Sequence, residues 1–333
     1  MDPVTQGVLG AALPQATSKN SVVVAAGVFG FLSGMAADLD ILIKSSTDPL
    51  LFLEYHRQFT HSLIFIPVGG FLSALVLYWL IGKRLKVTFK QSLLFCTLGY
   101  ATHALLDACT TYGTMLFWPF SDERISWNTI SIIDPLLTLP LLFLVLAAGI
   151  KKKNIFGRIA IVWAVLYMSL GMWQRDTAIQ MGKLIAEKRG HVLVRIDAKP
   201  SFANILVWKI VYETSERFYV DAVRTAPYPR VFIGTSVAKL NLTKDFAWLD
   251  LNSQQAKDIE RFSWFSNGYL AQDPQRSDQI IDIRYSLVPN DIKALWSIRV
   301  KSAAPKDTHV EYLTHRGKVS ESFDKLWRMI YKN

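Results

Sequence analysis

The chain has 333 residues, of which 51% are hydrophobic and 19% charged, with a net charge of +10. Its mean hydropathy is +0.22. Soluble proteins average about 25% charged residues, so this composition excludes a disordered chain, a fibrous repeat and a purely soluble globular protein. Residues 1–174 carry 12 Lys and Arg with 9 Asp and Glu, whereas residues 175–333 carry 25 and 18. We therefore expect a polytopic membrane domain at 1–175 and a water-soluble domain at 176–333.

Five apolar runs, each near the length that crosses a bilayer, predict long membrane helices. They cover residues 21–37, 63–81, 91–109, 132–150 and 155–173. A shorter apolar segment, 4–16, predicts a re-entrant helix that pairs with the first run, and the alternative is a free cytoplasmic N-terminus. Small residues in the first run, among them Gly27, Gly30 and Gly34, favour close approach of a neighbouring helix.

The distribution of Lys and Arg predicts the orientation of these helices. Basic residues gather between the second and third runs, at 83–90, and between the fourth and fifth, at 151–153. Loops rich in Lys and Arg usually remain in the cytoplasm. The loops at about 38–61 and 110–131 are then outside, and the domain that follows the fifth run is extracytoplasmic.

The few ionisable side chains of the membrane domain gather at the outer end of the predicted helices. Ionisable groups in a span are costly and usually mark function. His103 and Asp107 are four residues apart, so on a helix they point the same way, as two ligands of one metal would. The other members of this set are Asp38, Asp40, His56, His61 and Asp134.

Each part of this set also has a simpler interpretation. His103 and Asp107 could form a hydrogen-bonded strut or part of a proton relay. Asp38 and Asp40 could be ordinary helix-end residues, and Asp134 precedes a proline, as a helix cap often does. These alternatives do not explain why the residues fall at one face of the membrane, which the Lys and Arg pattern predicts independently. One metal site explains it better.

Several motifs, in chain order, resemble those of the YdjM family: MDPVTQG, DLD, HRQFTHS, HALLDACTTYGT and IIDP. The resemblance covers roughly residues 1–175. The family consists of inner-membrane proteins described as metal-dependent hydrolases, so it implies a bacterial inner-membrane location and hydrolase chemistry. The family commonly has a Thr-His pair where this chain has Thr5 and Gln6. Asp2 or Gln6 would then supply an oxygen ligand or a supporting hydrogen bond, which requires the N-terminus to reach the outer side.

These residues predict one or two divalent ions, with Zn²⁺ favoured and Mn²⁺ as the alternative. The expected core ligands are His56, His61, His103 and Asp107. Asp38 and Asp40 are expected to bridge two ions or to bind the second, and Asp134 is a further candidate.

Other polar residues in these motifs have predicted supporting roles. Arg57 would hold an anionic group such as phosphate, and the alternative is an interfacial Arg that extends to the water. Thr110 and Tyr112 would donate hydrogen bonds to substrate or to ligand carboxylates. Thr60 would cap the helix that follows.

The expected depth of the site indicates its substrate. Ligands at the outer membrane–water boundary meet lipid headgroups, so a phospholipid or other lipid-linked ester or phosphoester is the leading candidate. A small soluble ester is the alternative. The competing function is a non-catalytic membrane protein with a structural or sensory metal or lipid site. A transporter is less favoured, because its polar residues would lie near the midplane.

The second domain predicts an α+β fold with a mainly antiparallel sheet. Segments rich in β-branched and aromatic residues follow Gly190. They cover 191–198, 203–214, 216–223, 230–237, 279–287 and 294–300. A helix is expected around 253–262, and a closing helix at 318–331 with Ser320 as its cap. The domain's net charge of +7 favours anionic lipid headgroups. Nucleic acid is not expected, because the domain is predicted to be extracytoplasmic.

Overall fold

The computed structural model describes residues 1–315, 317 and 319–331, and it divides into two compact units. The helical unit comprises Met1–Ile43, Tyr55–Trp173 and Phe202–Asn204. The sheet unit comprises Lys44–Glu54, Gln174–Ser201 and Ile205–Asn333. The loop Lys44–Glu54 therefore belongs to the sheet unit, although the residues on both sides of it belong to the helical unit.

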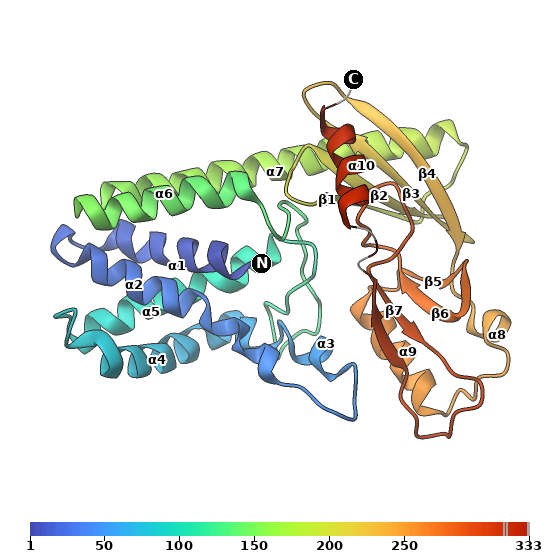
Figure 1. Ribbon diagram of the computed structural model, residues 1–333, viewed down its shortest axis with the longest axis horizontal. Helices are drawn as coiled ribbons and strands as arrows, with labels where there is room; N and C mark the ends of the chain where they lie inside the picture. The colour runs from blue at the N-terminus through green and yellow to red at the C-terminus, as the bar shows by residue number, and fades with distance from the viewer. Residues whose placement is uncertain (316, 318, 332–333) are drawn as a thin grey trace. The chain divides into compact units, whose positions relative to one another are not determined.

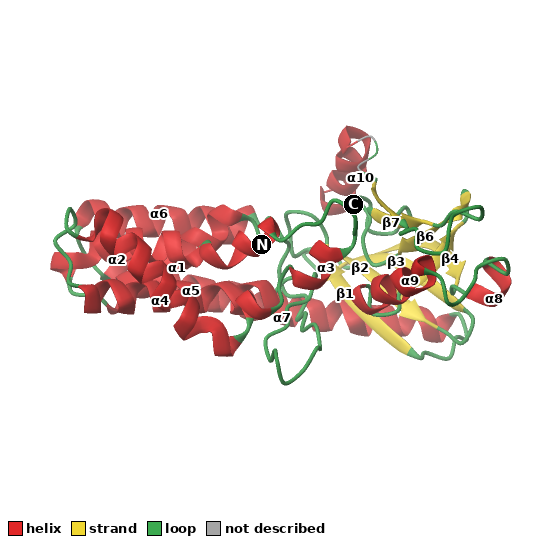
Figure 2. Ribbon diagram, turned by 90° about the horizontal axis from the view of Figure 1, so that it is seen from below, coloured by secondary structure: helices red, strands yellow, loops and turns green. Residues whose placement is uncertain are grey.

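The helical unit is a bundle in which α1, α2, α4, α5 and α6 run side by side (Figures 1 and 2). Short 3₁₀ segments (η) connect several of them, and η5 is a π-helical turn that continues α4. The bounds are α1 (Pro3–Thr17), η1 (Asn20–Val22), α2 (Val23–Gly34), η2 (Ala36–Leu42), η3 (Phe59–His61), η4 (Leu63–Phe65), α4 (Ile66–Leu77), η5 (Tyr78–Gly82), α5 (Phe89–Ala108), α6 (Pro135–Lys151) and α7 (Ile155–Lys188), which continues into the sheet unit.

Local sequence signals start these helices. The side chain of Asp2 accepts a hydrogen bond from the first turn of α1, which begins with a proline. Thr88 and Gln91 form a capping box at the start of α5. Asp134 caps α6 in the same way as Asp2 caps α1, and again a proline follows the cap.

Three helices in the described part of the chain are long and apolar enough to cross a membrane: Asn20–Leu42, Leu63–Gly82 and Ile155–Lys188. They correspond to the first, second and fifth predicted runs. The third run forms α5, whose 20 residues include polar side chains. The fourth forms α6, a shorter apolar helix of 17 residues, because Asp134 delays its start to Pro135. Three of the five predicted runs thus form helices that are long and apolar enough to cross a membrane.

Glycines allow α1, α2 and α5 to meet backbone against backbone. A Cβ atom at Gly30 would lie 2.3 Å from the carbonyl oxygen of Gly10. A Cβ atom at Gly99 would lie 2.5 Å from the carbonyl oxygen of Gly30. No side chain fits at either position, so the close approach predicted from the small residues of the first run is present.

The sheet unit contains two four-stranded antiparallel sheets, where the sequence predicted one. The first has the order β1 (Arg195–Pro200), β2 (Val207–Glu213), β3 (Arg217–Arg224), β4 (Arg230–Ala238). The second has the order β5 (Leu270–Asp273), β6 (Arg276–Asp282), β7 (Trp296–Arg299), β8 (Glu311–Thr314). The strands β5 and β8, of four residues each, were not predicted from the sequence.

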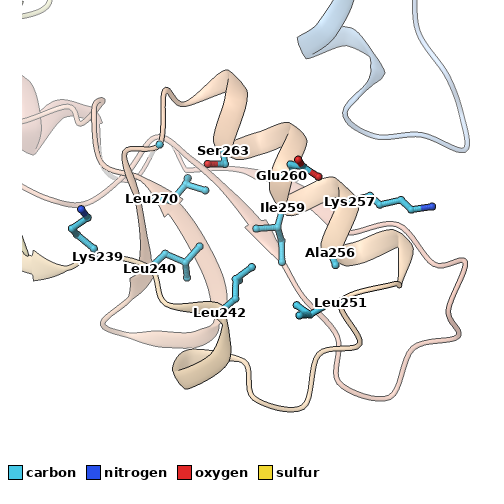
Figure 3. Close-up of a pocket in the computed structure, with 11 residues that line it drawn as sticks. Lys239, Leu240, Leu242, Leu251, Ala256, Lys257, Ile259, Glu260, Ser263 and Leu270 are labelled. Carbon is cyan, nitrogen blue, oxygen red and sulfur yellow. The ribbon is translucent and has the colours of Figure 1, made fainter. Parts of the chain in front are cut away.

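The two sheets share an apolar core that includes Val211, Phe218, Tyr269 and Ile281. The helices of this unit are α3 (Leu51–Tyr55), α8 (Leu242–Asp245), α9 (Gln254–Phe265) and α10 (Val319–Tyr331). Ser253 caps α9 as the predicted helix start requires. The predicted cap Ser320 lies inside α10, and Lys318 lies outside the described residues. One face of α9 lines a groove of about 470 Å³ (Figure 3).

Candidate metal centre

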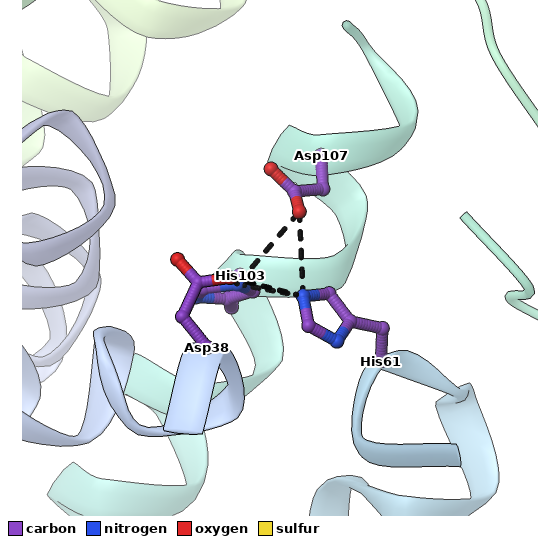
Figure 4. Close-up of side chains that lie close together, drawn as sticks. All are labelled: Asp38, His61, His103 and Asp107. Atoms are coloured by element: carbon purple, nitrogen blue, oxygen red, sulfur yellow. Dashed lines mark hydrogen bonds and ion pairs between the residues drawn. The ribbon is translucent and has the colours of Figure 1, made fainter. Parts of the chain in front are cut away.

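Two groups of His and Asp side chains in the described residues lie close enough to hold a cation. The first comprises Asp38, His61, His103 and Asp107, and the second comprises Asp38, Asp40 and His56. In the first, three chain segments contribute: η2 carries Asp38, η3 carries His61, and the last two turns of α5 carry the other two (Figure 4).

The ligand atoms of the first group converge on one point. His61 Nε2 lies 2.9 Å from His103 Nε2, 3.5 Å from Asp38 Oδ1 and 3.3 Å from Asp107 Oδ2. His103 Nε2 lies 3.4 Å from Asp38 Oδ1 and 3.8 Å from Asp107 Oδ2. A tetrahedral zinc with ligands at 2.0–2.2 Å has ligand-to-ligand separations of roughly 3.3–3.6 Å. The residues therefore fit a single divalent ion.

Both histidines of this group are oriented through their other ring nitrogen. His103 Nδ1 lies 2.6 Å from the carbonyl oxygen of Gly34, which can only accept, so Nδ1 is the protonated nitrogen and Nε2 is available to a metal. His61 Nδ1 lies 3.2 Å from Asp40 Oδ2 and 3.0 Å from Thr60 Oγ1. Thr60 was predicted to cap a helix, but its hydroxyl donates to Asp40 at 2.7 Å.

Asp107 is held from three sides. Its Oδ1 accepts hydrogen bonds from the Met1 backbone nitrogen at 2.6 Å and from Gln6 Nε2 at 2.8 Å. Its Oδ2 lies 2.9 Å from Arg57 Nε. Gln6 thus donates a hydrogen bond to a candidate ligand, and its role in metal binding stays a prediction. Its Oε1 atom is buried and makes no hydrogen bond.

Arg57 is buried beside Asp107 and can fix the orientation of that carboxylate. The residue is 4% exposed, its Nη1 donates to Thr110 Oγ1 at 3.1 Å, and its guanidinium lies 5.2 Å from the centre of the Tyr112 ring. Thr110 in turn donates to the carbonyl oxygen of Asp107 at 2.7 Å. These contacts engage Arg57 with protein groups, whereas the sequence predicted a contact with a substrate anion.

The second group is organised around Asp40. Its Oδ1 lies 2.8 Å from His56 Nδ1, and its Oδ2 accepts from the Arg57 backbone nitrogen at 3.0 Å as well as from Thr60 and His61. Both carboxylate oxygens of Asp40 are therefore engaged with donors. The His56 side chain is 23% exposed, whereas that of Asp40 is fully buried.

Three predicted residues contact other parts of the fold. Asp134 caps α6, accepts a hydrogen bond from the Tyr167 hydroxyl at 2.8 Å, and belongs to neither group. Asp2 caps α1 and accepts from the Thr5 hydroxyl, which also meets that of Thr138 in α6. The Met1 nitrogen and the Gly34 carbonyl were missed, because a backbone group gives no residue-type signal of its role.

The charges of the two groups favour the binding of a cation. Three carboxylates face one guanidinium, the amino group of Met1 and three imidazoles. Burial lowers the pKa of His61, but hydrogen bonds with Asp107, Asp38 and Asp40 outweigh it and raise this pKa to about 10. The carboxylates therefore draw positive charge onto the site, and a divalent cation at the same point would satisfy the same demand in place of the proton.

The open side of the first group lies at Asp38, whose side chain is 26% exposed, while those of His61, His103 and Asp107 are fully buried. Three residues that follow Asp38 in η2 are apolar and exposed. Their exposed fractions are 63% for Leu39, 49% for Ile41 and 72% for Leu42.

Comparisons with known proteins assign the chain to a family. The family described as YdjM inner membrane protein matches residues 1–178. Inner membrane protein YbcI of Escherichia coli (strain K12) is 32% identical over 108 residues, which cover 31% of this chain and 60% of that protein. The chain thus spans about 60% of the length of this curated relative. No solved structure matches the chain.

Proposed function

This chain belongs to the YdjM inner membrane protein family, and we propose that it is a metal-dependent hydrolase of a phospholipid or other lipid-linked ester or phosphoester. The observation that carries the proposal is the convergence of two imidazole nitrogens and two carboxylate oxygens at the spacings of a coordination sphere. Nitrogen and oxygen donors in this number favour Zn²⁺, with Mn²⁺ as the alternative.

We assign one tightly held ion to the four-residue group. Asp40 is already engaged by four donors, so its role is to orient His56 and His61, as carboxylates beside metal-bound histidines commonly do. A second ion at Asp38, Asp40 and His56 would need to displace the hydrogen bond between Asp40 and His56.

The chemistry follows from these positions. A divalent cation held here would supply Lewis acidity, which polarises a carbonyl or phosphoryl oxygen and activates water. Asp40 binds His56 through Nδ1, so the Nε2 of this partly exposed ring is directed away from Asp40 and can take or give a proton. Arg57 keeps Asp107 in place.

The surroundings of the open side favour a lipid over a soluble substrate. Leu39 and Leu42, which follow Asp38 in η2, expose apolar surface close in sequence to the open side. Acyl chains gain free energy by covering such apolar surface, at about 25 cal/mol for each Å². A small soluble ester brings little apolar surface and gains correspondingly less.

The alternative function is a structural or sensory metal site, and one observation favours it. Catalytic zinc sites usually have three protein ligands and one open position, whereas four protein ligands are typical of structural sites. The first group offers four. The partial exposure of Asp38 supports the catalytic assignment, because this is the ligand that can move aside for a substrate.

The test uses full-length protein in nanodiscs, with metal content and hydrolysis of phosphatidylethanolamine and phosphatidylglycerol measured in the same samples. We expect about one ion per chain and a turnover that chelation removes and Zn²⁺ restores. His103→Ala should lose both, and His191→Ala, a histidine of the sheet unit, should keep both. Metal without turnover would support the structural alternative, and absence of metal from the wild type would overturn the proposal.

A further inference from the structure

Two of the four proposed ligands sit on short segments joined by a loop. Asp38 lies on η2, of seven residues, and His61 on η3, of three. Hydrogen bonds in 3₁₀ segments have poorer geometry than those of α-helices, so such segments hold their side chains less firmly. His103 and Asp107, by contrast, share the 20-residue helix α5. The positions of Asp38 and His61 therefore depend on what holds the loop between them.

That loop, Lys44–Glu54, is part of the sheet unit, and Arg261 of α9 holds it. The guanidinium binds both carboxylate oxygens of Asp48, at 3.0 Å from Nη1 and 2.8 Å from Nη2. Its Nε binds the carboxylate of Glu54. The contact of a guanidinium with a carboxylate through two nitrogens is strong and directional, so the middle of the loop and its last residue are fixed to one side chain.

Arg261 is itself anchored within the sheet unit. Its Nη1 donates to Asp258 Oδ1 at 2.9 Å, and Asp258 is fully buried. The other oxygen of Asp258 accepts from the Val310 backbone nitrogen at 3.1 Å and lies 2.8 Å from His309 Nδ1.

An aromatic contact supports the same attachment. The rings of Phe52 and Tyr312 meet edge to face, with centroids 5.3 Å apart. Burial raises the pKa of Asp48, but its hydrogen bond with Arg261 has the opposite effect, and the pKa lies below its usual value. The loop carboxylate is thus charged and paired at neutral pH.

We propose that Arg261 is a positioning residue for the metal centre: by holding Asp48 and Glu54, it fixes the loop that joins two ligand-bearing segments and so preorganises Asp38 and His61. This inference rests on the proposed metal-binding function. It assigns to the sheet unit, which lies almost entirely outside the family match, a role in the chemistry of the helical unit. Preorganised ligands lose less conformational freedom when they bind, so the affinity is higher.

The test removes the loop side of this contact and leaves Arg261 paired with Asp258. In Asp48→Asn/Glu54→Gln, we expect Co²⁺ and Zn²⁺ to bind about 3- to 10-fold more weakly, less than the 10–100-fold typical of groups bonded directly to a ligand. The Co²⁺ absorption spectrum should change, because it reports ligand geometry. Amide hydrogen exchange in residues 36–61 should rise in the metal-free protein.

The matched control is Asp278→Asn/Glu311→Gln, in which another arginine, Arg299, loses its two carboxylate partners. This control should keep the wild-type affinity, spectrum and exchange. Wild-type affinity and spectrum in Asp48→Asn/Glu54→Gln would overturn the positioning role. If the wild type binds no metal, the proposed function fails instead, and unchanged exchange in residues 36–61 would then show that the loop is not held either.

Discussion

The two units handle buried charge differently. In the sheet unit, Asp282 is fully buried, and Arg284 binds both of its carboxylate oxygens at 2.7–3.1 Å and the carbonyl oxygen of Phe265 at 3.0 Å. The two charges of this pair match each other. In the helical unit, three carboxylates face one guanidinium and the amino group of Met1, and they converge with imidazoles on a common point. A closed pair is typical of a structural role, whereas a cluster of imidazoles and carboxylates that converges on one point is typical of a site that receives a cation.

The largest effect is expected at the centre of the cluster. Asp107→Ala removes one proposed ligand and the partner of Arg57, so bound metal should fall to background, a loss of about 100-fold or more in affinity. Elemental analysis of purified protein measures it. Asp134→Asn is the matched control, because Asp134 is a buried carboxylate of the same unit outside both groups. Loss of metal in this control would return Asp134 to the ligand set, as the sequence predicted.

The pair of Asp282 and Arg284 should affect the stability of the protein and leave metal binding unchanged. Asp282→Ala leaves Arg284 buried without its counter-ion, which typically costs roughly 3–5 kcal/mol of unfolding free energy. Urea unfolding followed by the fluorescence of buried tryptophans measures the loss, while metal content should remain unchanged. Asp278→Ala, at a more exposed pair, should cost about 1 kcal/mol or less. A parallel loss of metal in Asp282→Ala would contradict the separation between the two kinds of cluster.

A third buried ionisable group, Lys209, should make the stability of the sheet unit depend on pH. Lys209 is fully buried, and although Asp291 and Asp282 favour its charged form, burial lowers its pKa to about 7. Between pH 7 and 10.5 the unfolded chain therefore holds a proton that the folded chain lacks, so stability rises with pH in this window, by up to about 5 kcal/mol. Lys209→Met should flatten this rise and Lys257→Met, at an exposed lysine, should not. Equal slopes in wild type and Lys209→Met would show that Lys209 stays charged.

The smallest expected effect distinguishes a residue that orients a ligand from a residue that binds the metal itself. Asp40→Asn keeps the shape of the side chain but weakens its hold on His61, so metal affinity should fall by about 10–100-fold without a change in the number of bound ions. Titration against a competing chelator measures it, and Asp122→Asn, at an exposed residue, is the control. A drop from two bound ions to one would make Asp40 a ligand of a second metal.

Much of the site could be predicted because ionisable residues are rare in residues 1–174. His103 and Asp107 stand out in an apolar run, and their spacing places both on one face of a helix. Asp134 stands out equally, yet its partner Tyr167 is 33 positions away, and that contact gives no local signal. Composition shows that a polar side chain needs a partner, but it does not identify the partner.

The fold shows the same limit. The runs rich in β-branched and aromatic residues at 207–213 and 217–224 predict strands well, because nearly all side chains of these strands are buried. The contact between Arg261 and Asp48 joins residues 213 positions apart, and nothing in either neighbourhood predicts it. The assignment of Lys44–Glu54 to the sheet unit could be found only in three dimensions.

The burial of His61, His103 and Asp107 has a consequence for the kinetics of metal exchange. Three of the four proposed ligands are closed to solvent, so an ion can leave only past Asp38 and only when the segments that hold the buried ligands open. Exchange with a labelled zinc isotope should therefore be slow, on the timescale of local opening and not of ligand dissociation. The ion found in purified protein would then record which metal was present when the chain folded, and growth in media of different metal content should change its identity.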